Sequence, residues 1–155
     1  MRRSWLLGVI ILTVNAAGVT AALAKPSGMT KTEMSRASLV SDAARVDFAR
    51  GGETQVVKLS LEPGGTTDWH RHPVKGMFLV DKGTMTNYGL GGPPCDPVNL
   101  SPGEAVLFGP HDHAHLVRNT GTERLELTVL YFNLASGQAG AEPANRPAEC
   151  PVDLN

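Results

Sequence analysis

Histidine is the residue type with the clearest capacity for chemistry in this chain, and its placement is uneven. The sequence has five histidines in two clusters: His70 and His72, then His111, His113 and His115. Residues two positions apart on a β-strand point to the same face, so His70 and His72 can present two imidazoles to one metal ion. A third imidazole from the distant second cluster would close such a site and make metal binding depend on the folded chain.

The residues around both clusters resemble the two sequence motifs of the cupin superfamily. The resemblance covers roughly residues 50–133 and keeps the order of turns and strands that a cupin needs. It implies an all-β, single-domain jelly roll, or double-stranded β-helix barrel, of about eight strands. It also implies that His115 completes a metal site with His70 and His72. The first motif is Gly64, His70-Arg71-His72-Pro73 and Gly83, and the second is Gly103-Glu104, Pro110, His115, Asn119 and Gly121.

Two positions depart from the cupin pattern. Cupins usually supply a glutamate ligand four residues after the second histidine, and this position is Gly76 here. The stretch from Gly103 to Pro110 is also one residue longer than usual, and Asp112 stands where a turn glycine is expected. Aspartate adopts left-handed backbone conformations more readily than most residues, so the turn can be kept. The resemblance therefore implies a three-histidine site that lacks the carboxylate ligand.

A site of three histidines without a carboxylate restricts which metal ions can bind and which reactions they can support. Three neutral imidazoles leave a divalent ion with its full +2 charge and up to three open coordination positions, and they suit Fe²⁺, Zn²⁺, Ni²⁺ or Cu²⁺ better than the harder Mn²⁺. Among cupins, three-histidine iron sites occur in thiol, diketone and ring-cleaving dioxygenases. The resemblance therefore implies Fe²⁺ first, with the other four ions as alternatives, and a dioxygenase that uses O₂ on a small, anionic, chelating substrate.

Three other interpretations stay open, because a fold does not fix a function. The same pocket could serve a non-catalytic protein of the cell envelope that binds a metal or a small ligand. It could also serve a metal-assisted lyase or isomerase. Finally, His70, His72 and His115 could be structural residues in a barrel that has lost its metal.

Four further side chains are candidates for supporting roles. Strand alternation would aim Asp68 in the same direction as His70, where its carboxylate could accept a hydrogen bond from a ligand imidazole; the alternative is an exposed loop carboxylate. Tyr88 is the candidate catalytic residue, donating a proton or a hydrogen bond inside the barrel, although strand tyrosines are commonly core residues. His111 and His113 would lie on the rim, from which His113 could reach the cavity.

Short apolar or alternating runs, separated by Gly, Pro, Asn and Asp, predict the strands that would position these side chains. We assign residues 37–134 to the barrel and expect no amphipathic helix there. Residues 135–155 are rich in Gly, Ala, Pro, Gln and Asn and are predicted to be a loop-like tail. The expected strands are residues 56–61, 77–80, 84–90, 98–100, 105–108 and 125–132.

The N-terminus has the features of a secretory signal peptide. Two arginines precede an apolar run from Trp5 to Val14, which is too short to span a bilayer, and Ala22-Leu23-Ala24 offers a cleavage site. We therefore expect residues 1–24 to be removed and residues 25–36 to form a flexible leader. The mature protein would then be secreted or periplasmic, without a membrane span. An uncleaved anchor and a twin-arginine signal are the alternatives.

The charge of the mature chain argues against nucleic acid and anionic membranes as partners. Residues 1–24 hold two arginines and no acid, which leaves 12 basic and 15 acidic residues. A weakly acidic chain without basic runs offers no electrostatic footprint for phosphates. A small molecule is the expected partner, and cupins often form homodimers through sheet edges.

The two cysteines predict a disulfide. Cys95 and Cys150 lie in proline-containing, loop-like surroundings and form no Cys-x-x-Cys motif. In an oxidising compartment, a disulfide is favoured over a metal or redox site. Such a bond would tie the C-terminal tail to the barrel.

Overall fold

The structure is a computed structural model of the chain, and it describes residues 33–41, 45–90, 95–110, 113–150 and 152. All of them fall in one unit, Glu33–Asn155. This part of the chain holds ten strands and no helix, so no helix in it could cross a membrane. The predicted signal peptide, most of the predicted leader, His111 and Asp112 lie outside the described residues.

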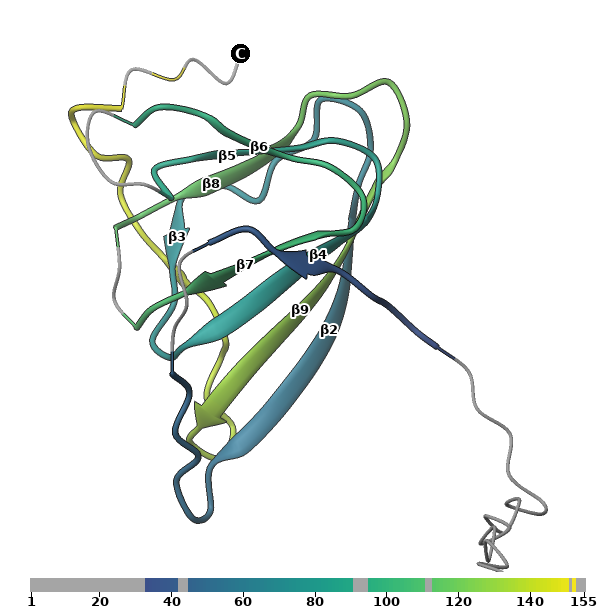
Figure 1. Cartoon of the computed structure of the whole chain (residues 1–155). Coiled ribbons are helices and arrows are strands. Elements are labelled where there is room, and N and C mark those ends of the chain that lie inside the picture. Colours follow the sequence, from purple (N-terminus) through teal and green to yellow (C-terminus); the bar gives the residue numbers. More distant parts are fainter. Residues whose placement is uncertain (1–32, 42–44, 91–94, 111–112, 151, 153–155) are drawn as a thin grey trace, which may run out of the picture. The chain divides into compact units, whose positions relative to one another are not determined.

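The strands form one large and two small sheets (Figure 1). Neighbouring strands are antiparallel except β1 and β7, which pair in parallel. Figure 1 shows the three-stranded sheet over the five-stranded one, with β3 running between them. The predicted all-β barrel is confirmed. The large sheet has the order β1 (Ser38–Leu39), β7 (Glu104–Phe108), β4 (Gly76–Lys82), β9 (Leu125–Leu134) and β2 (Glu53–Leu61); the small sheets are β6 (Val98–Leu100), β5 (Met85–Tyr88) and β8 (Leu116–Asn119), and β10 (Glu142–Pro143) with β3 (His70–Arg71).

The core lies between the two larger sheets, because alternation turns apolar side chains of each sheet toward the other. Strand β9 shows the pattern most clearly. Leu125, Leu127 and Val129 are buried in the main core cluster, and Tyr131 packs against it. Burial of each leucine or valine stabilises the fold by roughly 1.5–3 kcal/mol. These contacts hold β9 in register between β2 and β4.

A buried asparagine closes the turn after β8. The Asn119 side chain donates hydrogen bonds to the carbonyls of Leu61 (2.9 Å) and Glu123 (2.8 Å). It also accepts a hydrogen bond from the Gly121 amide at 3.0 Å. Asn119 is fully buried, so these bonds replace the water that its amide would otherwise need. They fix the far end of the strand that begins beside His115.

The C-terminal tail folds back on the barrel. Strand β10 pairs antiparallel with β3, and farther along Cys150 forms a disulfide with Cys95, with Cα atoms 5.2 Å apart. The tail is therefore more ordered than its composition predicts. The tail is ordered by main-chain pairing with β3 and by the disulfide, rather than by apolar side chains.

Candidate metal centre

Three histidines meet where β3 approaches β8. His70 begins β3, His72 follows its end, and His115 directly precedes β8. His70 and His115 form an isolated antiparallel bridge, with main-chain N–O distances of 3.0 and 2.9 Å. Arg71 between the first two histidines is exposed, whereas His72 and His115 are buried. Alternation along β3 therefore directs His70 and His72 to the side on which His115 lies.

The three imidazoles converge through their Nε2 atoms. His115 Nε2 lies 3.0 Å from His70 Nε2 and 3.1 Å from His72 Nε2. One ring nitrogen of each residue lies within 4.8 Å of the others. Two imidazole nitrogens that share a metal at 2.0–2.1 Å are about 2.9–3.4 Å apart in octahedral or tetrahedral geometry. The residues present therefore fit a transition-metal ion.

Main-chain carbonyls fix the ring orientation of two of these histidines. His70 Nδ1 lies 3.0 Å from the carbonyl oxygen of Asp68, and His72 Nδ1 lies 2.7 Å from that of Gly140. A carbonyl oxygen can only accept, so each Nδ1 carries the proton and donates it. The Nε2 atoms of His70 and His72 are then the unprotonated ring nitrogens, and they face His115 Nε2, which is the tautomer that a metal requires.

Burial keeps the rings neutral. It lowers the pKa of His115 to about 2, and repulsion from the His70 and His72 rings adds to the shift. Burial also lowers the pKa of His70. At neutral pH both imidazoles are therefore in the unprotonated form that binds metal.

An aromatic ring occupies the side of the site from which a fourth ligand would be expected. Phe108 stacks on His72, with ring centroids 4.0 Å apart and 28° between the planes. Gly76 pairs with Phe108 on one side and with Tyr131 on the other. A Cβ at Gly76 would overlap the Phe108 ring and the Leu130 carbonyl oxygen. The missing glutamate thus has a steric cause, because position 76 has no room for any side chain.

A small cavity adjoins the histidines. It has a volume of about 40 Å³ and is lined by the three histidines, Thr67, Tyr131 and apolar side chains of β2, β4, β8 and β9. A larger hollow of about 380 Å³ shares Leu59, Thr67, His70 and Tyr131 with it and is also lined by residues of the tail. We call this larger hollow the vestibule. It gives the histidines a route to the surface.

Tyr131 is a site residue that sequence reasoning missed. It lines both the small cavity and the vestibule, and its ring centroid lies 5.5 Å from that of His72. Burial raises the pKa of Tyr131, so its phenol stays protonated and can donate a hydrogen bond. Tyr131 lies in the site because β9 pairs with β4 and places it opposite Gly76. Gly76 is four residues after His72. No local pattern in the sequence reveals that nonlocal register.

Tyr88, the candidate catalytic residue, packs on the side of β5 away from the histidine cavity. Tyr88 packs against the buried cluster of Trp69, Leu116 and the two cysteines. It lines neither the small cavity nor the vestibule. Alternation along β5 explains this: Met85 is in the main core, and Tyr88, three positions later, faces the opposite side of the sheet.

Asp68 and His113, the candidates for supporting roles, both have exposed side chains. Asp68 has a positive φ of 59°, which breaks the strand alternation that would have aligned its side chain with that of His70. Its carboxylate is exposed, and its main-chain carbonyl is the acceptor for His70 instead. His113 is exposed and is not part of the histidine group.

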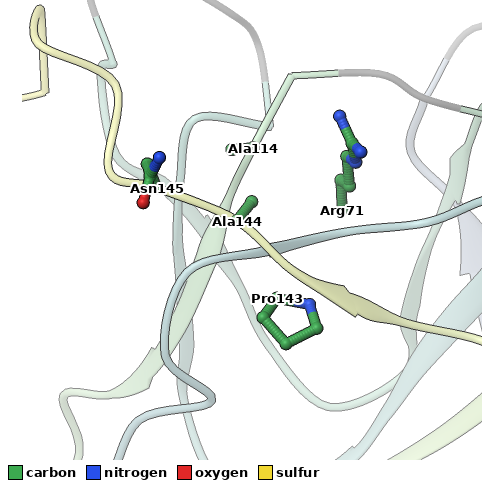
Figure 2. Close-up of a pocket in the computed structure, with 5 residues that line it drawn as sticks. All are labelled: Arg71, Ala114, Pro143, Ala144 and Asn145. Atoms are coloured by element: carbon green, nitrogen blue, oxygen red, sulfur yellow. The ribbon is translucent and has the colours of Figure 1, made fainter.

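A further hollow of about 450 Å³ lies beside the tail (Figure 2). It is lined by Arg71, Ala114, Pro143, Ala144 and Asn145. Arg71 Nε lies 3.5 Å from a carboxylate oxygen of Glu142, and both side chains are largely exposed. Arg71 points away from the three histidines, so the hollow that it lines is separate from the histidine cavity.

This chain is similar to known proteins in sequence and in structure. A family model described as the cupin domain matches residues 57–131. A cupin-like protein of Thermotoga maritima is 27% identical, with a TM-score of 0.49 over 59% of this chain and 64% of that chain. A Klebsiella pneumoniae protein with a double-stranded β-helix domain is 22% identical, with a TM-score of 0.48 over 61% and 77% of the two chains.

A third solved structure, from Acidithiobacillus ferrooxidans, is 28% identical, with a TM-score of 0.45 over 52% of this chain. The chain spans 51% of that protein's length. A search of curated protein sequences finds no match. The segment that the cupin model matches runs from β2 to β9 and contains all three converging histidines. Residues 57–131 of this chain form a domain of the cupin superfamily.

Proposed function

We propose that this chain is an exported cupin that holds one divalent transition metal, Fe²⁺ by preference, at His70, His72 and His115. We further propose that it catalyses an O₂-dependent oxidation of a small, anionic, chelating molecule. The observation that carries the proposal is the convergence of His70 Nε2 and His72 Nε2 on His115 Nε2, at 3.0 and 3.1 Å, with two tautomers set by main-chain carbonyls.

The charge of the centre supports an anionic ligand. Among the described residues, the group of potential ligands contains three histidines and no carboxylate, and with these ligands alone a bound divalent ion would keep its +2 charge. Such an ion supplies a Lewis acid, and as iron also a one-electron redox centre for O₂. The apolar lining of the small cavity lowers the local dielectric and strengthens the attraction for an anion. The Tyr131 phenol, protonated at the cavity wall, is suited to orient the bound molecule by a hydrogen bond.

The size of the cavities supports a small substrate. About 40 Å³ beside the histidines accommodates little more than a water-sized or diatomic molecule. The vestibule of about 380 Å³ is at the lower end of the range for small-molecule sites. A substrate of a few heavy atoms could place its chelating group at the histidines and the remainder in the vestibule.

The disulfide supports export. Cys95 and Cys150 are bonded and buried, and such bonds persist in oxidising compartments. Together with the signal-like residues 1–24, this favours a secreted or periplasmic protein. The mass of the N-terminal peptide of protein purified after export tests the cleavage near Ala24.

Oxygen consumption tests the proposed activity. Exported protein is loaded anaerobically with one equivalent of Fe²⁺ and mixed with small chelating acids, thiols and diketones in an oxygen electrode. We expect substrate-dependent O₂ uptake that His115→Ala abolishes and that His113→Ala, at an exposed position, leaves intact. Metal binding without turnover of any compound would indicate a ligand-binding protein. Turnover without O₂ uptake would indicate a lyase or isomerase.

A further inference from the structure

The end of the chain runs alongside the segment that carries two of the histidines. The Ala144 amide donates to the Trp69 carbonyl at 3.0 Å, and β10 pairs with β3. The carbonyl of Gly140 accepts the Nδ1 proton of His72 at 2.7 Å, and this bond is buried. Residues 140–150, which we call the C-terminal strap, thus contact the metal centre directly.

The start of the strap is held tightly against the site. A Cβ at Gly140 would overlap the Tyr131 ring, so the backbone can approach this closely only because residue 140 is glycine. Ala141, Glu142 and Pro143 continue along the wall of the vestibule. The strap therefore bounds the entrance as well as orienting His72.

The end of the strap is fixed by the disulfide. Cys95 and Cys150 are buried in one cluster with Trp69 and Leu116. Trp69 directly precedes His70, and Leu116 directly follows His115. The disulfide therefore packs against the residues that flank His70 and His115. The strap that it anchors orients His72.

We propose that the C-terminal strap is a positioning element of the metal centre and that the Cys95–Cys150 disulfide makes metal affinity depend on redox state. This inference rests on the metal site of the proposed function. Two electrons from a thiol or phosphine reductant cleave the S–S bond and give two cysteine thiols, while the reductant is oxidised. The strap then loses its covalent tie and keeps non-covalent contacts, among them the β10–β3 pairing and the Ala144–Trp69 hydrogen bond.

Release of the strap has a specific consequence for His72. Without the Gly140 carbonyl, the Nδ1 proton loses this buried hydrogen bond, and the tautomer with the proton on Nε2, which cannot bind a metal through Nε2, becomes more populated. Loss of such an acceptor lowers metal affinity about 10–100-fold. His70 is an internal control, because its acceptor, the Asp68 carbonyl, lies in the same turn and not in the strap.

The experiment compares the oxidised wild-type protein with a Cys95→Ser/Cys150→Ser variant, which has no thiol that could bind metal. Co²⁺ is the probe: its affinity is measured by chelator competition, and its absorption spectrum reports the ligand set. Long-range ¹⁵N NMR of the metal-free proteins near pH 8 reports the histidine tautomers. Leu100→Ala, a buried position in β6, is the control for general loss of stability, and all measurements are made well below the melting temperatures.

We expect Co²⁺ affinity to fall about 10–100-fold in the double variant, with a mixed tautomer at His72 and an unchanged one at His70. Equal Co²⁺ affinity with an unchanged His72 tautomer would overturn the inference. A similar loss of affinity in Leu100→Ala would overturn it too, since the effect would then be global. If the oxidised wild-type protein binds no Co²⁺, the metal site itself fails, and the His72 tautomer alone decides whether the strap positions the ring.

Discussion

Phe108 lies flat against His72, with ring centroids 4.0 Å apart. Its ring also fills the space into which a side chain at Gly76 would point. One contact therefore accounts for two properties of the site: the orientation of a histidine and the absence of a fourth ligand from β4. With Phe108 in this position, a ligand side chain at residue 76 would need the neighbouring ring and main chain to move.

The first prediction concerns Gly76. Gly76→Ala should destabilise the fold by about 3 kcal/mol, because a Cβ meets the Phe108 ring and the rigid carbonyl of Leu130. Thermal melting followed by circular dichroism measures the change. Gly121→Ala is the matched control, since the nearest atoms to its Cβ lie at 3.3 and 3.4 Å. If both variants melt together with the wild type, the close packing around Gly76 is wrong.

The second prediction concerns metal stoichiometry. The exported protein should hold one transition-metal ion per chain, measured by elemental analysis after dialysis. His70→Ala, His72→Ala and His115→Ala should each lose most of it, because two imidazoles bind far more weakly than three. His113→Ala should keep the metal, since His113 is exposed. Retention of metal in all four variants would contradict the assignment of the site.

The third prediction concerns the stability of the metal-free protein at low pH. Burial lowers the folded-state pKa of His115 to about 2, whereas an unfolded histidine has a pKa near 6.5. Below about pH 6.5 the unfolded chain binds more protons than the folded one, so stability is full above that pH and falls as pH decreases.

Each such histidine should contribute a slope of about 1.4 kcal/mol per pH unit. The lowered pKa of His70 adds a contribution of the same sign. Urea denaturation between pH 7.5 and pH 5 measures the slope, and His115→Asn should reduce it. A pH-independent midpoint over this range would show that the rings are not buried in the neutral form.

Sequence reasoning could find the three histidines because their motif residues and their spacing are local. Alternation and turn residues are local signals as well, and they predict β2, β4, β5, β6, β7 and β9 but not the two-residue strands β1 and β10. Strand alternation does not predict the direction of the Asp68 side chain, because its positive φ interrupts that alternation. The Gly140 carbonyl could not be found at all, since a main-chain acceptor leaves no mark on residue type and its use depends on a nonlocal approach.

Tyr131 and Tyr88 illustrate the same limit in a matched pair. Both lie on strands, and residue type does not distinguish them. Tyr131 reaches the site because β9 pairs with β4 with Tyr131 opposite Gly76, while Tyr88 packs on the disulfide side of β5. Which tyrosine faces the histidines is decided by sheet register, which local patterning does not specify.

The last prediction uses that pair. Tyr131→Phe should keep the fold and the metal, because the ring still packs against His72 and Phe108, with centroids at 5.5 and 5.9 Å. It removes the hydroxyl, which burial keeps protonated by raising the pKa of Tyr131. If that hydroxyl orients the substrate, its removal should lower kcat/KM for O₂ uptake about tenfold, the value of one hydrogen bond of about 1.4 kcal/mol.

Tyr88→Phe is the control, and it should leave kcat/KM unchanged because Tyr88 lines neither the cavity nor the vestibule. Wild-type activity should also show no alkaline decline below about pH 10, since the raised pKa keeps the Tyr131 phenol protonated beyond the usual range. Metal content and melting temperature are measured for both variants, so that a loss of activity can be assigned to the hydroxyl. An equal kcat/KM in Tyr131→Phe, Tyr88→Phe and the wild type would remove Tyr131 from substrate binding and leave its ring as packing for His72.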